Sequence, residues 1–513
     1  MKPRLVAALL IAYLALCAIN VAAQQIPFLT DLLARSEAFY KLYNEKRRAG
    51  AKLDAFEPLR KRGEVQFRSG NLPGIIETLA EGTAMMQGKP WDERQRFIAS
   101  LTVEADRLVL EPHQELHLSL VRIFPTDTDK AFTAQPTVTF LIAPAGNQKS
   151  DGAKAKGPME PITLTERIPI GETQAGAARK LTLTDGAYTI IARIESGGQQ
   201  VADITQPLYA ISDFSDGLAQ LTKQVVEIKA ASDAKVKAVA PFVTTPEFQI
   251  QRLQPLNKNR SEVPLNPMDE FDLIEARLAA LARGENPFAV ERGEVERAYQ
   301  AADGKLIPYR LYVPQGYDGK TARPLAVLLH GALGDERYFF SDLFDPATVK
   351  SEAERRGYLL ASVNGRGRFT NYQGAAADDP LEVAGAVMRN YQVDPLRVYL
   401  AGHSMGGFGT WLVAARKPEL FAAIAPMSAG PPAQGDALNA LLEKVKPLPA
   451  LVVHGAKDGI VPPEFSKAMV EAAQKAGLKV TYLEVPDADH LSIIGASFSA
   501  ILDFFDKHAK AAK

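Results

Sequence analysis

The chain has 513 residues, which is room for about two to four domains. Its 46% hydrophobic and 23% charged residues are typical of a globular protein with an ordinary core. The formal net charge of -1 argues against nucleic acid or an anionic membrane surface as a partner.

The N-terminus has the pattern of a secretory signal peptide. Lys2 and Arg4 precede an apolar run from 5 to 19, and small residues lead up to Ala23. The run is short for a membrane span, which needs about 20 residues. Residues 1–23 are therefore predicted to be cleaved, and the protein is expected to be exported to a bacterial periplasm or exterior.

The single cysteine lies inside this leader. A lipoprotein anchored at Cys17 is disfavoured because Leu16 is larger than such a site prefers. Cleavage would leave a mature chain with no disulfide and no thiol chemistry.

The next segment, 24–105, is predicted to be an N-terminal helical region. Apolar residues recur at spacings near four, and the break at 70–74 separates two helical parts. The residues with this spacing are Phe28, Leu32, Phe39 and Tyr43.

From about 106 the apolar period changes from four to two. Short alternating runs with turns between them predict an immunoglobulin-like β-sandwich over 106–211, with 146–158 as a polar loop. His113 and His117 could share a strand face, but a solvated or packed pair fits them better than a metal site.

Helical spacing returns in 212–294, which is predicted to be a helical region and linker. Within it, 230–267 is rich in alanine, proline and charge and is interpreted as an irregular connection. No repeat of propeller or solenoid period is found.

Strand and helix signals alternate from about 295, so 295–513 is predicted to be an α/β domain. Its sheet is expected to be mostly parallel with helices on both faces. A capping box is expected at 379–382. The expected strands are 295–299, 306–313, 324–329, 359–363, the run before the motif at 402–406, 422–426, 451–453 and 479–485.

The motif Gly402-His403-Ser404-Met405-Gly406 stands at a predicted strand-to-helix corner. This is the G-x-S-x-G pattern of a nucleophile elbow. Glycine is needed two positions to either side because a Cβ there would collide in the tight turn. Ser404 is therefore the candidate nucleophile, with an exposed hydroxyl expected above the sheet.

A serine nucleophile needs a base within hydrogen-bond reach, and His490 is chosen for this role by exclusion. It lies in a loop after the last predicted strand, where its ring can reach the carboxyl edge of the sheet. His403 must point away from the serine, and His508 lies in a charged tail. The other two C-terminal histidines, His330 and His454, precede glycines at strand ends and fit packing roles.

The imidazole must be oriented by a carboxylate, and Asp458 follows the preceding strand at a suitable place. The chain order Ser404, Asp458, His490 is that of α/β-hydrolases. Asp487 and Asp489 are competing acids, but neighbours of a histidine in sequence are poorly placed to reach its ring.

Two backbone N-H groups are expected to bind the oxyanion, those of Met405 and Ala332. Leu333, Arg366 and Tyr372 are candidate substrate contacts because they lie in loops that leave strands at the same edge. Together with Arg368, the last two suit an acidic or aromatic substrate, although solvated loop residues fit the pattern equally.

Residues from about 295 to 510 resemble the α/β-hydrolase superfamily. Within it they are similar to secreted esterases and predicted peptidases related to prolyl oligopeptidase, dienelactone hydrolase and polyhydroxybutyrate depolymerase. The motifs are GHSMGGFGTW, HGALG, HGAKDGIVP and DADH. The missing propeller and disulfides depart from some of these relatives, whereas the predicted sandwich is similar to a domain that precedes the catalytic domain in some secreted esterases. Together these features favour an esterase.

The predicted activity is a serine carboxylic ester hydrolase that needs no metal or cofactor. Its expected substrate is a small-molecule or oligomeric ester. The alternatives are a serine peptidase of prolyl-oligopeptidase-like type and a binding protein with an inactive hydrolase domain. The acyl and alcohol groups and the oligomeric state do not follow from the sequence.

Overall fold

The computed structural model describes residues 29–145, 161–165, 167–171, 175–258 and 265–511. The chain divides into two compact units. Unit 1 joins Ser36–Asn71 to Pro287–Lys513, and unit 2 joins Pro27–Arg35 to Leu72–Asn286. The region predicted as one helical segment, 24–105, is therefore shared between the units. The predicted leader at 1–23 and the polar loop at 146–158 lie outside the described residues.

Unit 2 contains a two-sheet β-sandwich. One sheet has the order β1-β3-β7 and the other β2-β9-β8-β4-β5, with β6 paired to β4. This matches the A-B-E and G-F-C neighbours of an immunoglobulin fold. The strands are β1 (Leu101–Ala105), β2 (Val109–Leu110), β3 (Glu115–Arg122), β4 (Thr137–Pro144), β5 (Ile162–Thr163), β6 (Ile168–Pro169), β7 (Ala175–Lys180), β8 (Gly186–Ser196) and β9 (Gln199–Ala210).

The sandwich begins before the predicted boundary at 106, because β1 pairs antiparallel with β3. Alternate residues of both sheets form one core, as the period of two predicts. Phe140, Ile190 and Leu118 are among its buried members.

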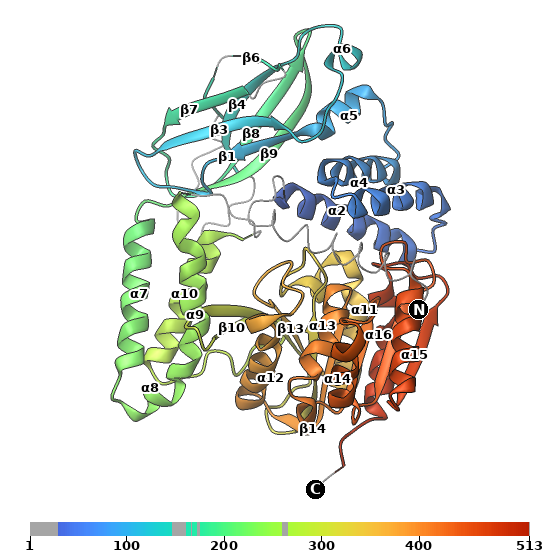
Figure 1. Ribbon diagram of the computed structural model, residues 1–513. Helices are drawn as coiled ribbons and strands as arrows, with labels where there is room; N and C mark the ends of the chain where they lie inside the picture. Colours follow the sequence, from blue (N-terminus) through green and yellow to red (C-terminus); the bar gives the residue numbers. More distant parts are fainter. Residues whose placement is uncertain (1–28, 146–160, 166, 172–174, 259–264, 512–513) are drawn as a thin grey trace. The chain divides into compact units, whose positions relative to one another are not determined.

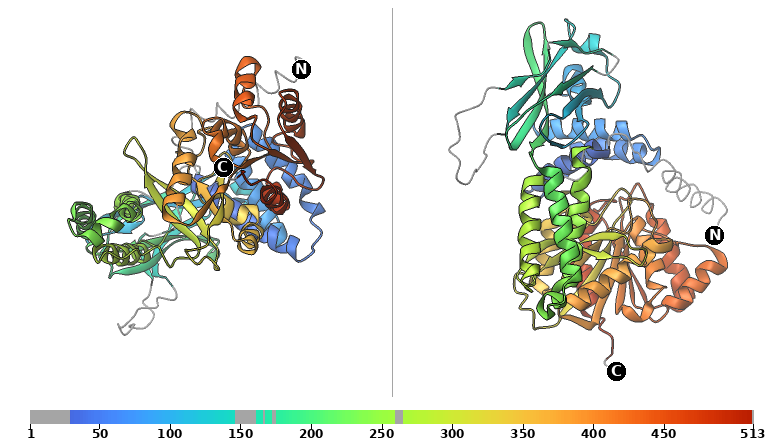
Figure 2. Two further views of the ribbon diagram at one scale, coloured as in Figure 1. Left: turned by 90° about the horizontal axis from the view of Figure 1, so that it is seen from below. Right: turned by 90° about the vertical axis from the view of Figure 1, so that its left-hand side faces the viewer.

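The remaining elements of unit 2 are helices (Figure 1). The connection predicted as irregular at 230–267 instead contains α8 and α9. Asp233 accepts hydrogen bonds from the first backbone amides of α8, and Ile250 of α9 is buried in the helical core. Helices α7, α9 and α10 pack side by side (Figure 2). The bounds are α4 (Leu72–Met86), α5 (Glu93–Ser100), α6 (Thr128–Ala131), α7 (Phe214–Ala230), α8 (Ala234–Val239), α9 (Thr244–Leu253) and α10 (Pro267–Ala282).

Unit 1 is built on a sheet of order β10-β11-β13-β12-β14-β15-β16-β17. Strands β12 to β17 are parallel, and the leading pair β10 and β11 is antiparallel, as expected. The strands are β10 (Gly293–Gln300), β11 (Leu306–Val313), β12 (Arg323–Leu329), β13 (Leu359–Val363), β14 (Val393–His403), β15 (Ala423–Met427), β16 (Ala450–Gly455) and β17 (Val480–Val485). We call residues 293–506 the α/β domain.

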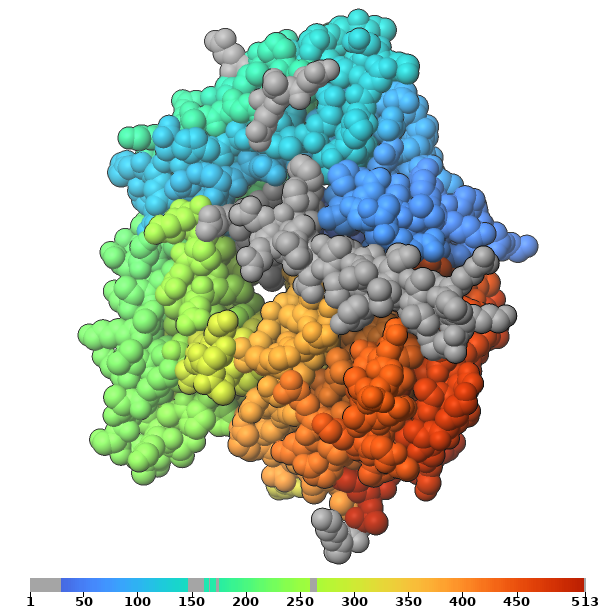
Figure 3. Space-filling model, viewed as in Figure 1, coloured from blue at the N-terminus to red at the C-terminus, as the bar shows by residue number. Residues whose placement is uncertain are grey.

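Helices cover both faces of this sheet. Successive residues of β12 alternate between two cores: Val327 packs in one with Trp411 of α13, and Leu328 in the other with Phe498 of α16. In the space-filling view, the orange residues of α12 to α14 form part of the outer surface of this domain (Figure 3). The helices are α11 (Pro346–Arg356), α12 (Asp379–Asn390), α13 (Met405–Ala414), α14 (Gly435–Val445), α15 (Pro463–Lys475) and α16 (Ile493–Asp506).

Residues 36–71, which we call the α2–α3 segment, belong to the same unit as the α/β domain. They contain the later part of α2 (Leu29–Arg48) and all of α3 (Glu57–Arg68). Asn44 donates to the carbonyl of Asp342 at 2.8 Å, and Arg47 pairs with Asp345 at 2.8 Å. No helix among the described residues is long and apolar enough to cross a membrane.

Candidate active site

The elbow has the strained geometry that its sequence predicts. Ser404 lies between β14 and α13 with φ 54° and ψ −117°, outside the ordinary regions for an L-residue. A Cβ on Gly402 would collide with the backbone of Gly406, and one on Gly406 with the backbone of Leu329. The requirement for glycine at both positions is confirmed. The Ser404 amide donates to the Met427 carbonyl at 2.9 Å, which ties the corner to β15.

The expected exposure of the nucleophile is wrong. Ser404 is only 6% exposed, and Asp458 and His490 are each 5% exposed. The loop after β12 lies close to the serine, because a Cβ on Gly331 would stand 3.3 Å from the Ser404 Cβ. All three candidate side chains therefore have little exposure to solvent.

His490 and Asp458 meet at the carboxyl edge of the sheet. His490 Nδ1 lies 2.7 Å from Asp458 Oδ2. The other carboxylate oxygen accepts the backbone amides of Ile460 and Val461 at 3.0 and 2.9 Å. The His490 ring centroid lies 4.7 Å from that of His403, the residue before Ser404. The structure thus brings the predicted base and acid beside the elbow.

Asp458 is held as a carboxylate. Burial alone would raise its pKa, but the charge of His490 and the hydrogen bonds from His454 and His490 lower the pKa well below the usual range. A second histidine was not expected here: His454 Nε2 lies 3.2 Å from the same Asp458 Oδ2. The sequence places His454 four residues before Asp458, and that spacing is the signal that could have identified it.

The competing acids are engaged elsewhere. Asp487 is exposed and pairs with Lys457 at 2.9 Å. Asp489 Oδ1 accepts the amides of Leu491 and Ser492 at 3.1 and 2.8 Å and so closes the turn before α16.

The other candidate bases are also occupied. His403 Nδ1 hydrogen-bonds with the Tyr338 hydroxyl at 2.8 Å, and burial lowers the His403 pKa well below its usual value. His508, just beyond the end of α16, has its Nδ1 2.8 Å from the Phe504 carbonyl of that helix. His330 braces the loop after β12, with Nδ1 2.7 Å from the Gly331 carbonyl and Nε2 2.8 Å from that of Asn364.

The expected oxyanion donors lie at the ends of neighbouring elements. Met405 is the first residue of α13, so its N-H precedes the first intrahelical hydrogen bond. Ala332 follows β12 in the loop that His330 braces, and the next amide, of Leu333, donates to Arg368 at 3.0 Å. Leu333 has φ 67°, so the chain turns sharply just after Ala332.

Two of the expected substrate contacts have structural roles instead. Arg366 pairs with Asp379 at 2.8 Å and with Asp303 at 2.5 Å. Tyr372 is fully buried, and its hydroxyl donates to the His330 carbonyl at 3.4 Å. The predicted capping box at 379–382 is wrong, because Asp379 is the first residue of α12 and the N-cap is Asp378, which makes no side-chain capping hydrogen bond.

The third, Leu333, is partly exposed on the loop after β12, and its carbonyl accepts Arg368 Nη1 at 2.7 Å. A cavity of about 510 Å³ is lined by residues of α12, α13 and α14, among them Leu381, Leu412 and Leu441, and by none of the site residues. Among the described residues, no group of three or more His, Cys, Asp or Glu side chains is arranged to hold a metal.

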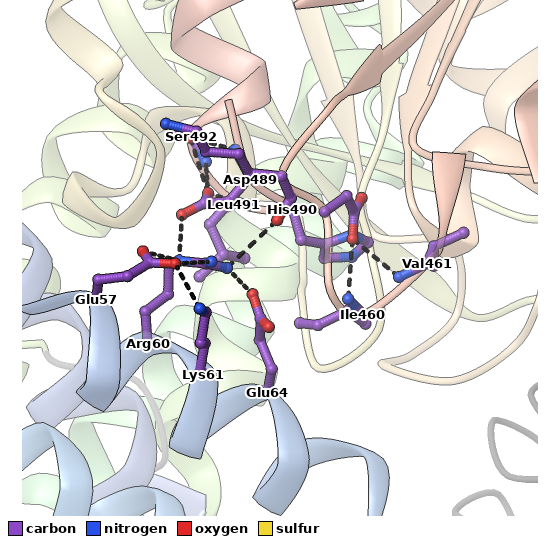
Figure 4. Close-up of polar contacts among 12 residues, drawn as sticks. Glu57, Arg60, Lys61, Glu64, Ile460, Val461, Asp489, His490, Leu491 and Ser492 are labelled. Atoms are coloured by element: carbon purple, nitrogen blue, oxygen red, sulfur yellow. Dashed lines mark hydrogen bonds and ion pairs between the residues drawn. The ribbon is translucent and has the colours of Figure 1, made fainter. Parts of the chain in front are cut away.

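Helix α3 is the neighbour of the site that the sequence did not indicate. Arg60 donates to the Lys457 carbonyl at 3.3 Å, and a Cβ on Gly459 would collide with the Glu64 carboxylate. Arg60 and Glu64 point from α3 toward the loop of Asp489 and His490 (Figure 4). Both contacts flank Asp458. Helical spacing alone carried no sign that this helix would lie there.

Comparison with known proteins agrees with this geometry. Residues 351–430 and 436–512 match a family model described as the prolyl oligopeptidase family. The chain is 25% identical over 259 residues to the uncharacterized peptidase YuxL of Bacillus subtilis (strain 168), covering 42% of this chain and 39% of that protein. It is 28% identical over 173 residues to the putative esterase NocK of Nocardia uniformis subsp. tsuyamanensis, covering 31% of this chain and 47% of that protein.

The matched region thus spans less than half the length of either curated relative. Among solved structures, the fluorophosphonate-binding serine hydrolase FphF of Staphylococcus aureus aligns with 16% identity and a TM-score of 0.36, over 42% of this chain and 99% of that chain. The α/β domain therefore resembles serine hydrolases of the α/β-hydrolase superfamily. The resemblance found in its motifs is confirmed, and it extends to both peptidases and esterases.

Proposed function

We propose that the protein hydrolyses carboxylic esters through an acyl-enzyme on Ser404. The observation that carries this proposal is the 2.7 Å contact between His490 Nδ1 and Asp458 Oδ2 beside the elbow. It orients the ring so that Nε2 is the nitrogen left to act on the serine.

The reaction would follow from these positions. His490 removes the proton from Ser404 as its oxygen attacks the ester carbonyl, and the amides of Met405 and Ala332 bind the oxyanion. His490 then returns the proton to the leaving alcohol. Water, activated by the same ring, hydrolyses the acyl-enzyme and frees the acid. Asp458 stabilises the imidazolium that forms in both halves, and no cofactor takes part.

An ester substrate is favoured over a peptide by the accompanying domain. The described part of the chain before the α/β domain contains a sandwich and helices, and the propeller of the prolyl oligopeptidases is not seen there. One curated relative is a putative esterase. We expect a small or oligomeric ester as substrate and export out of the cytoplasm, which a cell fractionation of the full chain would test.

The test is a comparison of two substrates on purified protein. A short p-nitrophenyl ester should be turned over at least 100-fold faster, by kcat/KM, than an aminoacyl p-nitroanilide, and Ser404→Ala should abolish both reactions. A preference of the same size for the anilide would contradict the ester assignment and leave the triad intact.

A serine peptidase is the second candidate, because the matching family model is described as the prolyl oligopeptidase family and one relative as a peptidase. The same residues would act on an amide, with His490 protonating the leaving amine. A third alternative is a binding protein with an inactive site. Failure of a fluorophosphonate to label Ser404 in the folded protein would favour it.

A further inference from the structure

The first turns of α3 lie against both loops that carry the acid–base pair. Arg60 Nη1 donates to the carbonyl of Lys457, which precedes Asp458, at 3.3 Å. Arg60 Nε lies 3.9 Å from Oδ2 of Asp489, which precedes His490. One guanidinium therefore reaches the chain neighbour of each partner (Figure 4).

The guanidinium is fixed on its own helix. Glu57, one turn earlier, accepts Nε at 2.8 Å and Nη2 at 2.7 Å, and Glu64, one turn later, accepts Nη1. The hydrogen bond with Glu57, with the nearby carboxylates, raises the Arg60 pKa despite partial burial. A planar fork held on two sides loses little entropy when it also binds the loops.

Each loop offers Arg60 a group that the loop itself does not use. The Lys457 amide donates to the Ala488 carbonyl at 2.9 Å, so the two loops already meet there, and the Lys457 carbonyl is left for Arg60. In Asp489, Oδ1 accepts the turn amides, and Oδ2 faces Arg60. Arg60 thus adds a second link between the loops, on the side of α3.

Glu64 depends on this arrangement. Its carboxylate lies against Gly459, next to Asp458, and burial together with Asp489 and Asp458 raises the Glu64 pKa. Arg60 is the cation that offsets the repulsion between these carboxylates. The α2–α3 segment is also anchored away from the site, by Asn44 and Arg47, so loss of Arg60 alone leaves it attached.

We propose that Arg60 is a positioning residue that ties the loop of Asp458 to the loop of His490 and so fixes the geometry of the acid–base pair. The inference rests on the proposed function, because it assigns Arg60 an effect on the ring that acts on Ser404. It makes α3, far from the α/β domain in sequence, a part of the active-site support.

The first experiment measures kcat and KM on a p-nitrophenyl ester for Arg60→Ala and Arg60→Lys in the full chain. We expect kcat to fall about tenfold for Arg60→Ala, equivalent to about 1.4 kcal/mol in the barrier, with KM changed less than twofold. Arg60→Lys should recover only part of the loss, since one ammonium cannot serve all these acceptors. Arg355→Ala, which removes an exposed arginine paired within α11, is the matched control and should leave kcat unchanged.

The second experiment is a double-mutant cycle on Gly459 and Glu64. Gly459 does not have positive φ, and the nearest atoms to an added Cβ are those of the Glu64 carboxylate, so alanine is compatible with the backbone. Gly459→Ala should lower kcat about as much as Arg60→Ala, because the methyl displaces Glu64 and with it Arg60. In the Glu64→Ala background the same change should have less than a twofold effect.

Two results would overturn the inference. One is a kcat within twofold of the parent for Arg60→Ala, and the other is an equal effect of Gly459→Ala in both backgrounds. If Arg60→Ala does not fold, the cycle decides alone. Failure of the proposed function is distinguished by Ser404→Ala: an ester hydrolysis that survives this change refutes the triad whatever Arg60 does.

Discussion

Two strand ends in the sheet of the α/β domain, which we call its two corners, have the same three residues but make different contacts. His330-Gly331-Ala332 follows β12, and His454-Gly455-Ala456 ends β16 and continues into the next loop; both histidines are fully buried. The His330 ring lies between two backbone carbonyls. The His454 ring lies between the Ser466 hydroxyl at 2.6 Å and the Val461 carbonyl at 2.8 Å, and it also contacts Asp458.

The difference arises from the residue four positions after each histidine. At the first corner this is Gly334, where a Cβ would collide with the Tyr338 ring. At the second it is Asp458, whose carboxylate turns back to the imidazole. At both corners the histidine thus braces a loop, and at the second corner it also contacts the carboxylate that the loop supplies.

The largest effect should come from removing that carboxylate. Asp458→Asn makes the second corner resemble the first, and kcat/KM on a p-nitrophenyl ester should fall about 10⁴-fold because the amide cannot stabilise the imidazolium. Asp487→Asn, an exposed acid near the same histidine, is the control and should stay within twofold. Retention of a tenth of the activity by Asp458→Asn would remove the basis of the comparison.

The two histidines should differ in their effect on rate. His454→Gln removes a contact to a charged group worth about 1.5–3 kcal/mol, and if that contact acts in the transition state kcat should fall about 10- to 100-fold. His330→Gln should lower kcat less, since it changes only the bracing of the loop that carries Ala332. The test is to measure kcat of both variants at one pH. An equal decrease in kcat would contradict the difference expected between the two histidines.

At the first corner, His330 should make the free energy of unfolding depend on pH. Burial lowers the pKa of His330, so the folded protein keeps the ring neutral while the unfolded chain takes up a proton below about pH 6.5. Stability is complete above that pH and is lost as pH falls below it, by at most about 1.4 kcal/mol per pH unit for one such group. Thermal unfolding at pH 7.5 and 5.5 should show a smaller decrease for His330→Gln than for the parent; an unchanged slope would refute this.

The smallest effect on rate is expected at a third strand end, after β13. Arg366→Ala should leave kcat and KM within twofold on acidic and neutral esters alike, because Arg366 pairs with Asp379 and Asp303. It should instead lower the free energy of unfolding, by about 1–3 kcal/mol, since Asp379 is buried and loses a charged partner. Loss of activity on acidic esters only would restore the predicted role in substrate binding.

The sequence predicts best those features that are determined by residues close together along the chain. The strands of the α/β domain and the elbow are encoded locally, by apolar runs and by the glycines at 402 and 406, and both were found. Asp458 and His490 could be selected because each follows a strand of one parallel sheet, whose carboxyl ends share an edge.

The errors concern partners that lie far apart along the chain. Arg366 and Tyr372 stood in a loop at the correct edge, but nothing local indicates that Asp303 and Asp379 would neutralise the arginine. Helices α8 and α9 were hidden by alanine, proline and charge, and became visible only through their packing in a core with α7 and α10. The position of α3 beside the site could not be predicted either, because helical spacing indicates a helix but not what it packs against.

Unit 1 is discontinuous, and this bears on how the protein is made. The α2–α3 segment leaves the ribosome before Leu72–Asn286 of unit 2, whereas the loops that receive it, around 457 and 489, are synthesised only after that part of unit 2. Arg60 therefore cannot reach its partners in these loops until they have been synthesised, whereas Glu57 and Glu64 already lie on its own helix. A nascent or truncated chain would contain the elbow serine before it contains His490 and the loops that Arg60 contacts, so under the proposed function hydrolysis would begin only after residue 490 has been synthesised.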